Sequence, residues 1–407
     1  MNHSFRNVCV VGLGYIGLPT AALLANRGHR VFGVDVQNHV VETINAGNIH
    51  IVEPDLDSFV RSAVGTGALT AHSEPQPADV FVIAVPTPLS EDRSPQMQYV
   101  WDAARMIAPV LQSGNLVILE STSPVGTTET VAEVLREAGA DTSSLAIAHC
   151  PERVLPGRIM IELSENDRIV GGVDQSSTQR VAEFYRSFVV GDVLETSART
   201  AEMTKLVENA SRDVQIAFAN ELSMLGDRFG VDVWDVIELA NHHPRVNILR
   251  PGPGVGGHCI AVDPWFLVDG AQEEAVLIRT ARERNLQKTD YVVDAIRTEI
   301  HNRAQRSGRQ ASDITVGLFG LAYKPDIDDL RESPALAIAR RLKADGWNLR
   351  VNEPNLGTHP EFALTELEDM AGGLDIAVLL VAHREYRALR FGETEVMDVC
   401  GVLRGER

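Results

Sequence analysis

Cysteine is scarce in this chain of 407 residues, which holds only Cys9, Cys150, Cys259 and Cys400. No two of them form a Cys-x-x-Cys pair, so the sequence shows neither a zinc-finger spacing nor a disulfide framework. Four thiols in a chain of this length suit a reducing compartment, and we therefore expect a cytoplasmic protein.

Cationic side chains are also few, and the sequence shows neither a long apolar run nor a cluster of His and Cys residues that suits a metal. The 37 Lys and Arg residues are outnumbered by 56 Asp and Glu residues, which gives a net charge of −19. We expect no nucleic-acid or membrane partner, although a local site can still bind phosphates. No apolar run reaches the roughly 18 residues of a membrane-spanning helix, and because a strand-like run begins so early we expect no signal peptide. His242 and His243 are adjacent and lack a further His or Cys cluster, so we expect no metal.

Strand-like and helical patterns alternate along the chain. Five apolar runs end in turns within the first 152 residues: NVCVVGLG, HRVFGVDV, ADVFVIAVPTP, NLVILESTSP and LAIAHCP. The pattern returns near the C-terminus in ITVGLFGLAYKPD, WNLRVNEP and LDIAVLLVAH. Such spacing is typical of βαβ units with a parallel sheet. We predict an α/β fold of two Rossmann-like doubly wound domains joined by a long central helix.

The central helix is predicted from residue 199 onward. Apolar residues recur there at three- and four-residue steps from Met203 to Phe229, as in a long amphipathic helix that spaces two domains or forms a dimer face. A second helical stretch is predicted over Glu273–Arg306, and the polar, basic segment NRAQRSGRQASD (302–313) is predicted to be a linker. The predicted domains are 1–195, 196–306 and 307–407.

The strongest local motif is VVGLGYIGLP, in which Gly12, Gly14 and Gly17 fit G-x-G-x-x-G directly after a strand. The first glycine makes the turn, the second lets backbone approach a pyrophosphate, and the third allows the helix to pack closely on the strand. Asp35 ends the next strand, where a carboxylate accepts hydrogen bonds from ribose hydroxyls and repels a 2′-phosphate. The sequence predicts a dinucleotide site that prefers NAD to NADP. We include the intervening Tyr15 and Ile16 among its residues.

Polar residues follow the later strands of the first domain. Thr87, Ser121 and Thr122 stand at strand ends, where ligands bind in open α/β sheets. Their hydroxyls either face cofactor or substrate, or cap turns. Glu152 follows the run LAIAHCP and is either functional or an ordinary solvated carboxylate.

The segment RPGPGVGGHCIAVDP, residues 250–264, places Cys259 in a loop of glycines and prolines. Such a loop is preorganised, so its thiol is either a nucleophile or a small buried apolar filler. Lys205 and Asn209 share one face of the central helix and offer donors for an oxyanion, or else are simply solvated. Lys324 and Arg331 follow a strand end, where they suit phosphates or a charged surface turn.

Six segments resemble, in order, the motifs of the nucleotide-sugar 6-dehydrogenases of the UDP-glucose/GDP-mannose dehydrogenase family. They are VVGLGYIGLP, STSPVGTT, CPERVLPG, EMTKLVENA, GPGVGGHCIAVDPWF and GLAYKPDIDDLRESP. The resemblance covers essentially the whole chain. His258 before the cysteine and Val262 before Asp263 are similar to members that act on UDP-N-acetyl-D-mannosamine. Members acting on UDP-glucose or GDP-mannose usually carry Ser and Lys at these places.

The resemblance implies a four-electron oxidation with NAD as cofactor. The C6 alcohol of the sugar becomes an aldehyde, Cys259 attacks it to form a thiohemiacetal, a second oxidation gives a thioester, and water releases the uronic acid. By the same resemblance Lys205 and Asn209 stabilise the oxyanions, and Asp263 works with Lys205 and a water that Thr122 orients. Glu152 acts as base in thioester hydrolysis. The group that takes the first proton stays open, as does the role of His258.

The resemblance also implies binding residues. Arg331 is placed near the cofactor phosphates, and Arg245 is matched to an arginine that a neighbouring subunit contributes, with His243 as a competitor. The residues expected near the substrate are Glu152, Arg153, Val154, Lys205, Asn209, Arg245, Asn247, Arg250, Gly256, Tyr323 and Lys324. We expect a homodimer or higher homo-oligomer with domain 1–195 for NAD, the Cys259 loop in 196–306, and domain 307–407 for the UDP-sugar.

Three alternatives remain open from the sequence. The first is another UDP-sugar, such as UDP-N-acetylglucosamine, because the sequence does not decide the preferred epimer. The second is a two-electron dehydrogenase of the hydroxyacid type, which needs no Cys259. The third is an NAD-sensing protein without turnover.

Overall fold

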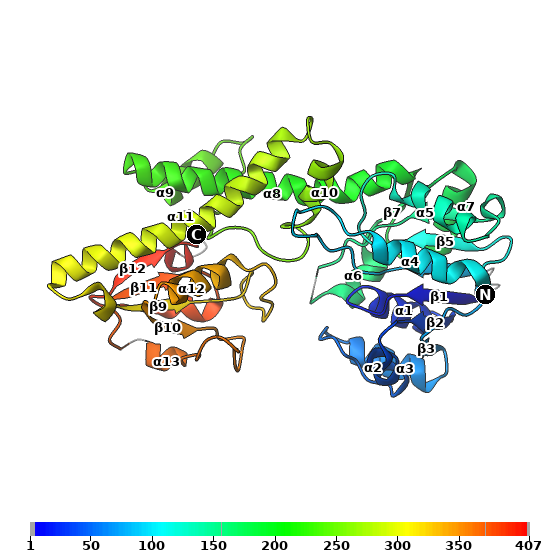
Figure 1. Ribbon diagram of the computed structural model, residues 1–407, viewed down its shortest axis with the longest axis horizontal. Helices are drawn as coiled ribbons and strands as arrows, with labels where there is room; N and C mark the ends of the chain where they lie inside the picture. The colour runs from blue at the N-terminus through cyan, green and yellow to red at the C-terminus, as the bar shows by residue number, and fades with distance from the viewer. Residues whose placement is uncertain (1–4, 156, 371, 405–407) are drawn as a thin grey trace. The chain divides into compact units, whose positions relative to one another are not determined.

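The computed structural model describes residues 5–155, 157–370 and 372–404 (Figure 1). The chain divides into two compact units. The N-terminal unit contains Met1–Val207 and Trp265–Gly270, and the C-terminal unit contains Glu208–Pro264 and Ala271–Arg407. Each unit is described by itself.

The N-terminal unit is built on an eight-stranded sheet of order β3-β2-β1-β4-β5-β6-β7-β8. Every pair of neighbouring strands is parallel except β6 and β7, which are antiparallel. The strands are β1 (Asn7–Val11), β2 (Arg30–Val34), β3 (Leu69–His72), β4 (Val80–Ile83), β5 (Leu116–Leu119), β6 (Ala146–His149), β7 (Arg168–Gly172) and β8 (Val193–Ser197). The predicted parallel sheet is confirmed, and the antiparallel step was not anticipated.

Helices cover both faces of this sheet. They are α1 (Gly17–Asn26), α2 (Asn38–Asn45), α3 (Leu56–Gly65), α4 (Gln98–Ile107), α5 (Thr127–Glu137), α6 (Ile159–Glu165) and α7 (Gln175–Arg186). Two separate apolar cores result: one includes residues of α1, α3, α6 and α7, and the other includes residues of α4 and α5. The strands β4, β5 and β6 in the middle of the sheet are buried on both sides, which identifies a doubly wound unit.

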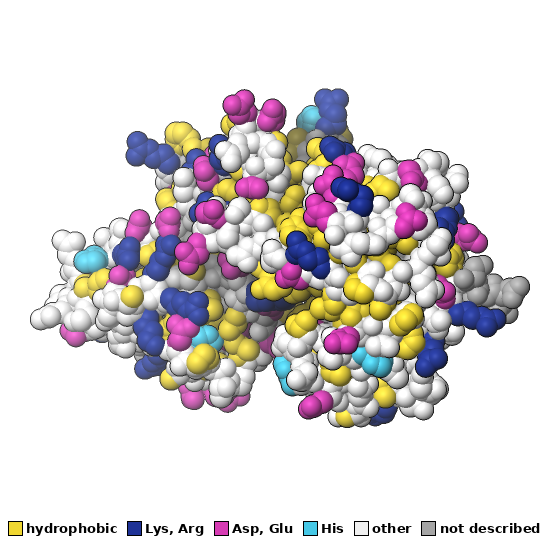
Figure 2. All heavy atoms as spheres, turned by 45° about the vertical axis from the view of Figure 1, so that its right-hand side comes forward, with side chains coloured by type: hydrophobic (Ala, Val, Ile, Leu, Met, Phe, Trp, Pro, Cys, Tyr) yellow, Lys and Arg dark blue, Asp and Glu magenta, His cyan; other side chains and the backbone are white. Residues whose placement is uncertain are grey.

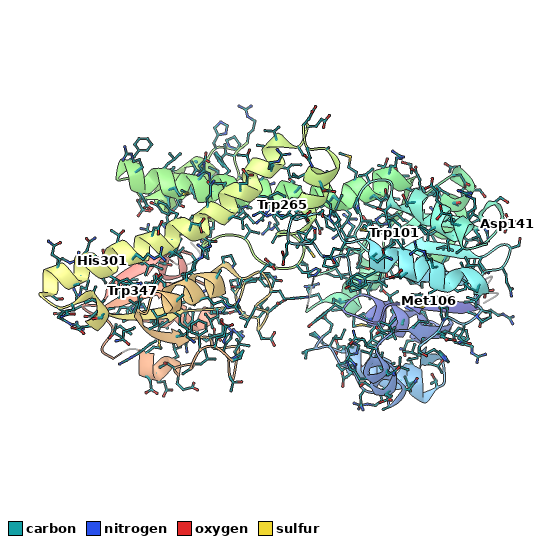
Figure 3. The ribbon with its side chains drawn as sticks, viewed as in Figure 1. Trp101, Met106, Asp141, Trp265, His301 and Trp347 are labelled. Carbon is teal, nitrogen blue, oxygen red and sulfur yellow. The ribbon has the colours of Figure 1, made fainter. Side chains whose placement is uncertain are left out.

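The C-terminal unit repeats this design on a smaller scale. Its four parallel strands have the order β10-β9-β11-β12. They are β9 (Thr315–Phe319), β10 (Asn348–Asn352), β11 (Ile376–Leu379) and β12 (Glu395–Asp398). The accompanying helices are α9 (Val233–Asn241), α11 (Val276–Ser307), α12 (Pro334–Ala344) and α13 (Leu367–Met370), and α10 (Asp263–Gly270) begins in this unit. His301 of α11 meets Trp347, before β10, edge-on with ring centroids 5.5 Å apart (Figure 3).

The predicted linker is wrong for its first half. Residues 302–307 form the last turns of α11, and Ala311–Asp313 form a short 3-10 helix. The basic and polar residues that suggested a linker are the solvated face of a helix end.

Helix α8 (Ala198–Phe229) confirms the predicted central helix, but its packed face differs from the predicted apolar stripe. Phe218 and Phe229 of that stripe are 52% and 73% exposed, whereas Asp213, Asn220 and Ser223 are buried. The contacts of these polar residues with α11 include those of Arg282 Nη1 with Asp213 (2.6 Å), Asn220 Nδ2 with Asn285 (2.9 Å) and Lys288 Nζ with Ser223 (2.7 Å). Polar pairs therefore join α8 to α11.

Acidic and basic side chains are interspersed on the face seen in Figure 2, without a patch of one sign. Among the described residues no helix has the length and apolar character to cross a bilayer.

Candidate active site

The glycine turn between β1 and α1 is shaped as the motif predicts. Gly12 has a φ of +91°, and a Cβ there would lie 2.5 Å from the Ala84 carbonyl oxygen. A Cβ on Gly17 would lie 1.8 Å from the Gly12 carbonyl oxygen, whereas one on Gly14 would meet nothing within 4 Å. Gly12 and Gly17 are thus required by the fold, and Gly14 leaves open space. No side chain caps the start of α1, and the positive end of its dipole favours an anion there.

Asp35 completes this cradle. Its carboxylate accepts hydrogen bonds from the backbone N–H of Leu13 (3.1 Å) and of Gln37 (2.9 Å), and the residue is only partly buried. These two bonds aim the carboxylate beside the turn and leave it further acceptor capacity. The geometry fits an adenosine ribose. Tyr15 is exposed beside the turn, and Ile16 is the N-cap residue directly before α1.

The strand-end hydroxyls hold the ends of β4 and β5 together. Thr87 donates to the Thr122 carbonyl oxygen (2.8 Å), and Ser121 donates to the Val85 carbonyl oxygen (2.8 Å). The hydroxyls of Thr87 and Ser121 therefore hydrogen-bond across the two turns. The Thr87 bond also fixes the backbone of Thr122. The following helix α5 is capped by Glu202 of α8, which accepts from the N–H groups of Gly126 (2.6 Å) and Thr128 (2.7 Å).

Glu152 is buried, and the sequence-based alternative of a solvated carboxylate is wrong. It is 8% exposed, and its Oε2 lies 2.6 Å from Nη1 of Arg168, which is also buried. Its Oε1 accepts the N–H of Arg153 at 2.6 Å. A carboxylate held on both oxygens has one orientation at the end of β6. Val154 nearby packs against the apolar core.

Glu120, which the sequence analysis passed over, lies in the same cluster. It is 2% exposed, its Oε2 accepts weakly from Thr20 Oγ1 (3.4 Å), and its Oε1 has no partner among the described residues. Burial, and secondarily the charge of Glu152, raise the pKa of Glu120 to about 8. Glu120 is thus mainly uncharged at neutral pH. The available signal was a glutamate placed directly at the end of the apolar run NLVIL.

Lys205 has a neutral neighbour. His149, at the end of β6, is fully buried, and neither ring nitrogen has a partner among the described residues. Its pKa is lowered to about 3, mainly by burial, and the charge of Lys205 lowers it further. The His149 imidazole is therefore uncharged at neutral pH and adds no positive charge beside Lys205.

Cys259, Asn209 and Asp263 are brought together in the C-terminal unit. Asn209 Nδ2 donates to Asp263 Oδ2 at 2.5 Å, and the N–H of Asp263 donates to the Cys259 carbonyl oxygen at 2.8 Å. Asp263 is 3% exposed, whereas Cys259 is exposed. The buried-filler alternative for Cys259 is therefore wrong. Lys205 lies one helical turn before Asn209 on α8.

The loop that carries Cys259 is clamped along its length. The N–H of Gly252 donates to Asn220 Oδ1 (2.9 Å), and Thr289 Oγ1 donates to the Pro253 carbonyl oxygen (2.9 Å). A Cβ on Gly257 would lie 2.7 Å from the ring of Tyr323. The glycines are thus required because the loop passes close to neighbouring chain.

The charged residues after β9 lie at the surface. Lys324 is exposed, and Arg331 forms an ion pair with Asp329 (2.6 Å). Burial lowers the pKa of His258, Arg331 lowers it further, and Asp329 and Glu332 oppose the shift. His258 is thus influenced by this charged loop. Residues 241–247 after α9, with Arg245 and Asn247, are exposed, as is Arg250.

The family comparisons agree with this geometry. Three models of the UDP-glucose/GDP-mannose dehydrogenase family match the chain: the NAD binding domain over residues 6–189, the central domain over 199–287 and the UDP binding domain over 317–404. The fold and the NAD cradle define an NAD-dependent nucleotide-sugar dehydrogenase. The chain belongs to the UDP-glucose/GDP-mannose dehydrogenase family.

Individual relatives match over their full length. The UDP-N-acetyl-D-mannosamine dehydrogenase of Yersinia pestis is 51% identical, over 98% of this chain and 100% of the relative. The NDP-N-acetyl-D-galactosaminuronic acid dehydrogenase of Ralstonia solanacearum is 51% identical, over 99% of this chain and 97% of the relative. A solved structure of the UDP-N-acetyl-mannosamine dehydrogenase from S. aureus has a TM-score of 0.88 at 39% identity, covering 98% of this chain and 96% of that one.

Proposed function

We propose that the protein oxidises the C6 alcohol of UDP-N-acetyl-D-mannosamine to the carboxylate of UDP-N-acetyl-D-mannosaminuronate. Each turnover consumes two NAD⁺ and one water and yields two NADH and three protons. The observation that carries the proposal is that exposed Cys259 lies on a clamped glycine loop, next to buried Asp263 at the start of α10, which binds Asn209 of α8. The relative from Yersinia pestis, which bears this activity in its name, supports the substrate.

NAD⁺, when bound, accepts a hydride from the sugar C6 in each oxidation. Gly12, Gly14 and Gly17 with the start of α1 would hold its pyrophosphate, and Asp35 its adenosine ribose. In the first oxidation the alcohol proton passes to a water held by Asp263, Lys205 and Thr122. The Lys205 ammonium and the Asn209 amide stabilise the alkoxide.

Cys259 then forms a bond from its sulfur to the aldehyde carbon. The carbonyl oxygen becomes the oxyanion of a thiohemiacetal, which the Asn209 amide and the Lys205 ammonium stabilise by about 3 kcal/mol per positioned donor. The second hydride leaves this carbon and the thioester forms. Asn209 is well suited to this task because its bond to Asp263 fixes its amide.

Glu152 acts last, as the base that activates the water which cleaves the thioester. The ion pair with Arg168 and the bond from the Arg153 N–H hold its carboxylate in one orientation. The sulfur leaves as a thiolate, the acid is released, and Cys259 is regenerated.

We further propose a cytoplasmic homodimer or higher homo-oligomer. Large apolar side chains lie exposed along α8 and α9, including Phe218, Phe229 and Leu239, at 52%, 73% and 70% exposure. A second copy of the chain would cover them. Arg245, or His243 in its place, would then enter the sugar site of the neighbouring copy.

A second substrate is favoured by one observation. The Ralstonia solanacearum relative is as similar as the Yersinia pestis one and is named for an N-acetyl-galactosaminuronic acid product. UDP-N-acetylgalactosamine and UDP-N-acetylglucosamine are therefore the alternatives to test.

The first test counts NADH formed per molecule of UDP-N-acetyl-D-mannosamine consumed, with the two alternative sugars and UDP-glucose measured alongside. The wild type should form two NADH with the preferred sugar, and Cys259→Ala should fail to complete the acid. Cys400→Ala, a half-buried thiol elsewhere, serves as the matched control and should behave as wild type. One NADH per sugar, or acid formation at the normal rate by Cys259→Ala, would overturn the thioester route.

A further inference from the structure

The loop between β9 and α12 begins on a buried carboxylate. Glu353, directly after β10, is 2% exposed, and its Oε2 accepts the N–H groups of Leu321 (2.7 Å) and Ala322 (2.9 Å). The same oxygen lies 3.1 Å from Nε2 of His383. Burial alone raises the pKa of Glu353, but the hydrogen bonds from His383 and from these N–H groups outweigh it and hold the pKa below its ordinary value. Glu353 is therefore an anion.

His383 is fully buried and carries the connection onward. Its Nδ1 accepts the backbone N–H of Asp326 at 2.9 Å, and the Asn355 amide lies 3.1 Å from the same nitrogen. Because Nδ1 accepts, the neutral ring carries its proton on Nε2 and donates it to Glu353. Glu353 and His383, which we call the carboxylate–histidine pair, thus bind three N–H groups of residues 321–326.

Asp326 has a backbone conformation that needs such support. Its φ is +62°, in the left-handed region that costs a non-glycine residue on the order of 1 kcal/mol. Besides the N–H bond to His383, its Oδ1 accepts the N–H of Arg384 at 3.0 Å. Two bonds to neighbouring residues therefore hold the one strained residue of the segment that carries Tyr323 and Lys324.

The far side of the same segment touches the Cys259 loop. A Cβ on Gly256 would lie 2.7 Å from Cβ of Tyr323, and the N–H of Gly257 donates to the Arg331 carbonyl oxygen at 3.0 Å. The position of Tyr323 is thus tied on one side to the carboxylate–histidine pair and on the other to the backbone next to Cys259.

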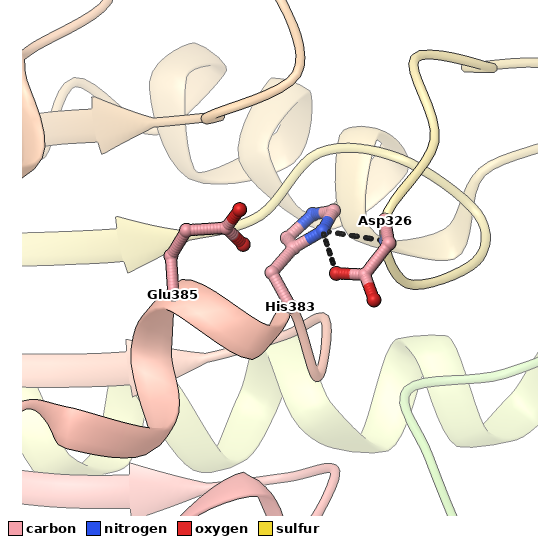
Figure 4. Close-up of side chains that lie close together, drawn as sticks. All are labelled: Asp326, His383 and Glu385. Atoms are coloured by element: carbon pink, nitrogen blue, oxygen red, sulfur yellow. Dashed lines mark hydrogen bonds and ion pairs between the residues drawn. The ribbon is translucent and has the colours of Figure 1, made fainter.

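A metal ion is a poor explanation of this cluster. Asp326, His383 and Glu385 place three possible ligand atoms within 4.8 Å of one another (Figure 4). However, Nδ1 of His383 is engaged with the Asp326 N–H, and Nε2 with Glu353. Both ring nitrogens therefore already have protein partners.

We propose that Glu353 and His383 are positioning residues that hold segment 321–326, and through it Tyr323 and Lys324, in the conformation that binds the UDP part of the substrate. The proposal rests on the proposed function, because the family resemblance places Tyr323 and Lys324 near the UDP-sugar that this function requires, within the stretch matched by the UDP binding domain. Neither residue of the pair touches the reacting atoms, so the expected effect is on nucleotide binding.

Two variants of His383 separate its two bonds. In His383→Asn the amide oxygen can replace Nδ1 and accept from Asp326, and in His383→Gln the amide nitrogen can replace Nε2 and donate to Glu353. The control is His359→Gln, because His359 Nδ1 likewise accepts a backbone N–H, from Glu361 at 3.0 Å, away from this loop. UDP and NAD⁺ binding are measured by calorimetry on the full chain, and KM and kcat are measured with the UDP-sugar.

His383→Gln should bind UDP about tenfold more weakly, as expected for loss of one positioning bond worth about 1.4 kcal/mol. Its KM for the UDP-sugar should rise in step while kcat and NAD⁺ affinity stay near wild type. His359→Gln should bind UDP as wild type does, and His383→Asn, which keeps the acceptor for the Asp326 N–H, should weaken UDP binding less than His383→Gln. Equal UDP affinity in His383→Gln and wild type would overturn the proposal and leave the proposed function standing. Failure of the wild type to bind UDP would overturn both.

A measurement on the wild type covers the case in which His383→Gln does not fold. Hydrogen exchange of the ligand-free protein should show slow exchange of the Leu321, Ala322 and Asp326 amides. Exchange of these amides at the rate of an open loop would overturn the proposal, because the segment would then not be held before UDP binds.

Discussion

The turn after β1 and the turn after β9 occupy equivalent places in the two sheets, but the carboxylates beside them make different contacts. Gly12 and Gly320 both follow the central strand, with φ values of +91° and +96°. The register pairs Val11 with Val34 and Phe319 with Asn352, so Asp35 and Glu353 are counterparts one residue further on. Asp35 is half-buried and binds two N–H groups, whereas Glu353 is buried and binds His383 as well.

The helices that follow the two turns also differ at their N-terminal ends. Helix α1 begins without a side-chain cap, whereas Ser333 caps α12 by accepting the N–H of Leu336. In the N-terminal unit the carboxylate is half-buried and the helix start is uncapped, and we propose that both face the cofactor. In the C-terminal unit both are used to hold the chain, and the residues that we propose for the UDP-sugar lie on the longer loop after β9. The same type of turn therefore has a half-buried carboxylate beside it in one unit and a buried, structural carboxylate in the other.

The largest expected effect comes from Glu353→Gln. The amide has one acceptor oxygen, and its NH₂ would face N–H donors, so the free energy of unfolding should fall by about 3 kcal/mol at pH 7. The folded pKa of Glu353 is lowered, so its contribution is present above its ordinary value of 4.5 and is lost as the pH falls through the folded pKa. The difference in the free energy of unfolding between Glu353→Gln and wild type should therefore shrink as the pH falls.

Chemical denaturation between pH 3 and pH 7 checks this prediction. Glu361→Gln is the matched control, because that carboxylate belongs to an exposed ion pair with Arg340. A pH-independent loss of stability in Glu353→Gln would show that the charge of Glu353 does not hold the loop.

Glu120→Gln sharpens the comparison, because this buried carboxyl has the opposite pKa shift. Its folded pKa is raised to about 8 from an ordinary value of 4.5, so its contribution to stability is complete below 4.5 and is lost as the pH rises toward 8. The variant should resemble wild type near pH 5 and be about 2 kcal/mol more stable than wild type at pH 9. Thermal unfolding across this range provides the measurement, and a constant difference between the two proteins would contradict the assignment of Glu120 as neutral.

The smallest expected effect is that of Asp35→Asn. This carboxylate faces a ligand, so the free energy of unfolding should change by less than about 1 kcal/mol. The preference for NAD over NADP should fall about tenfold, because the repulsion of a 2′-phosphate is removed. Steady-state kinetics with both cofactors test this expectation. A loss of stability as large as that of Glu353→Gln would show that Asp35, like Glu353, is needed to hold its turn.

The N-terminal turn could be predicted from sequence and its counterpart could not. Gly12, Gly14, Gly17 and Asp35 form a motif whose spacing predicts the geometry of the turn. Helical spacing singled out Asn209, and the family resemblance gave Asn209 and Asp263 their roles beside Cys259. Glu353 and His383 are 30 residues apart in the sequence and meet only through the sheet. No local pattern signals such a pair.

The packed face of α8 was missed for a related reason. Periodicity counts apolar residues, and it selected Phe218 and Phe229, which are exposed in the chain. The buried positions hold Asp213 and Asn220, whose burial depends on partners in α11. A hydrophobic pattern therefore predicted the helix but not the face that packs through polar pairs.

These polar pairs between α8 and α11 have a consequence for exchanging parts between relatives. Apolar helices tolerate small slips, but a slide of one turn, about 5.4 Å, would separate Asp213 from Arg282 and Asn220 from Asn285 together. The two helices therefore have a single permitted alignment. A chimera that takes one helix from another family member should fold only if it inherits both sides of each pair, so the two segments are inherited as one unit.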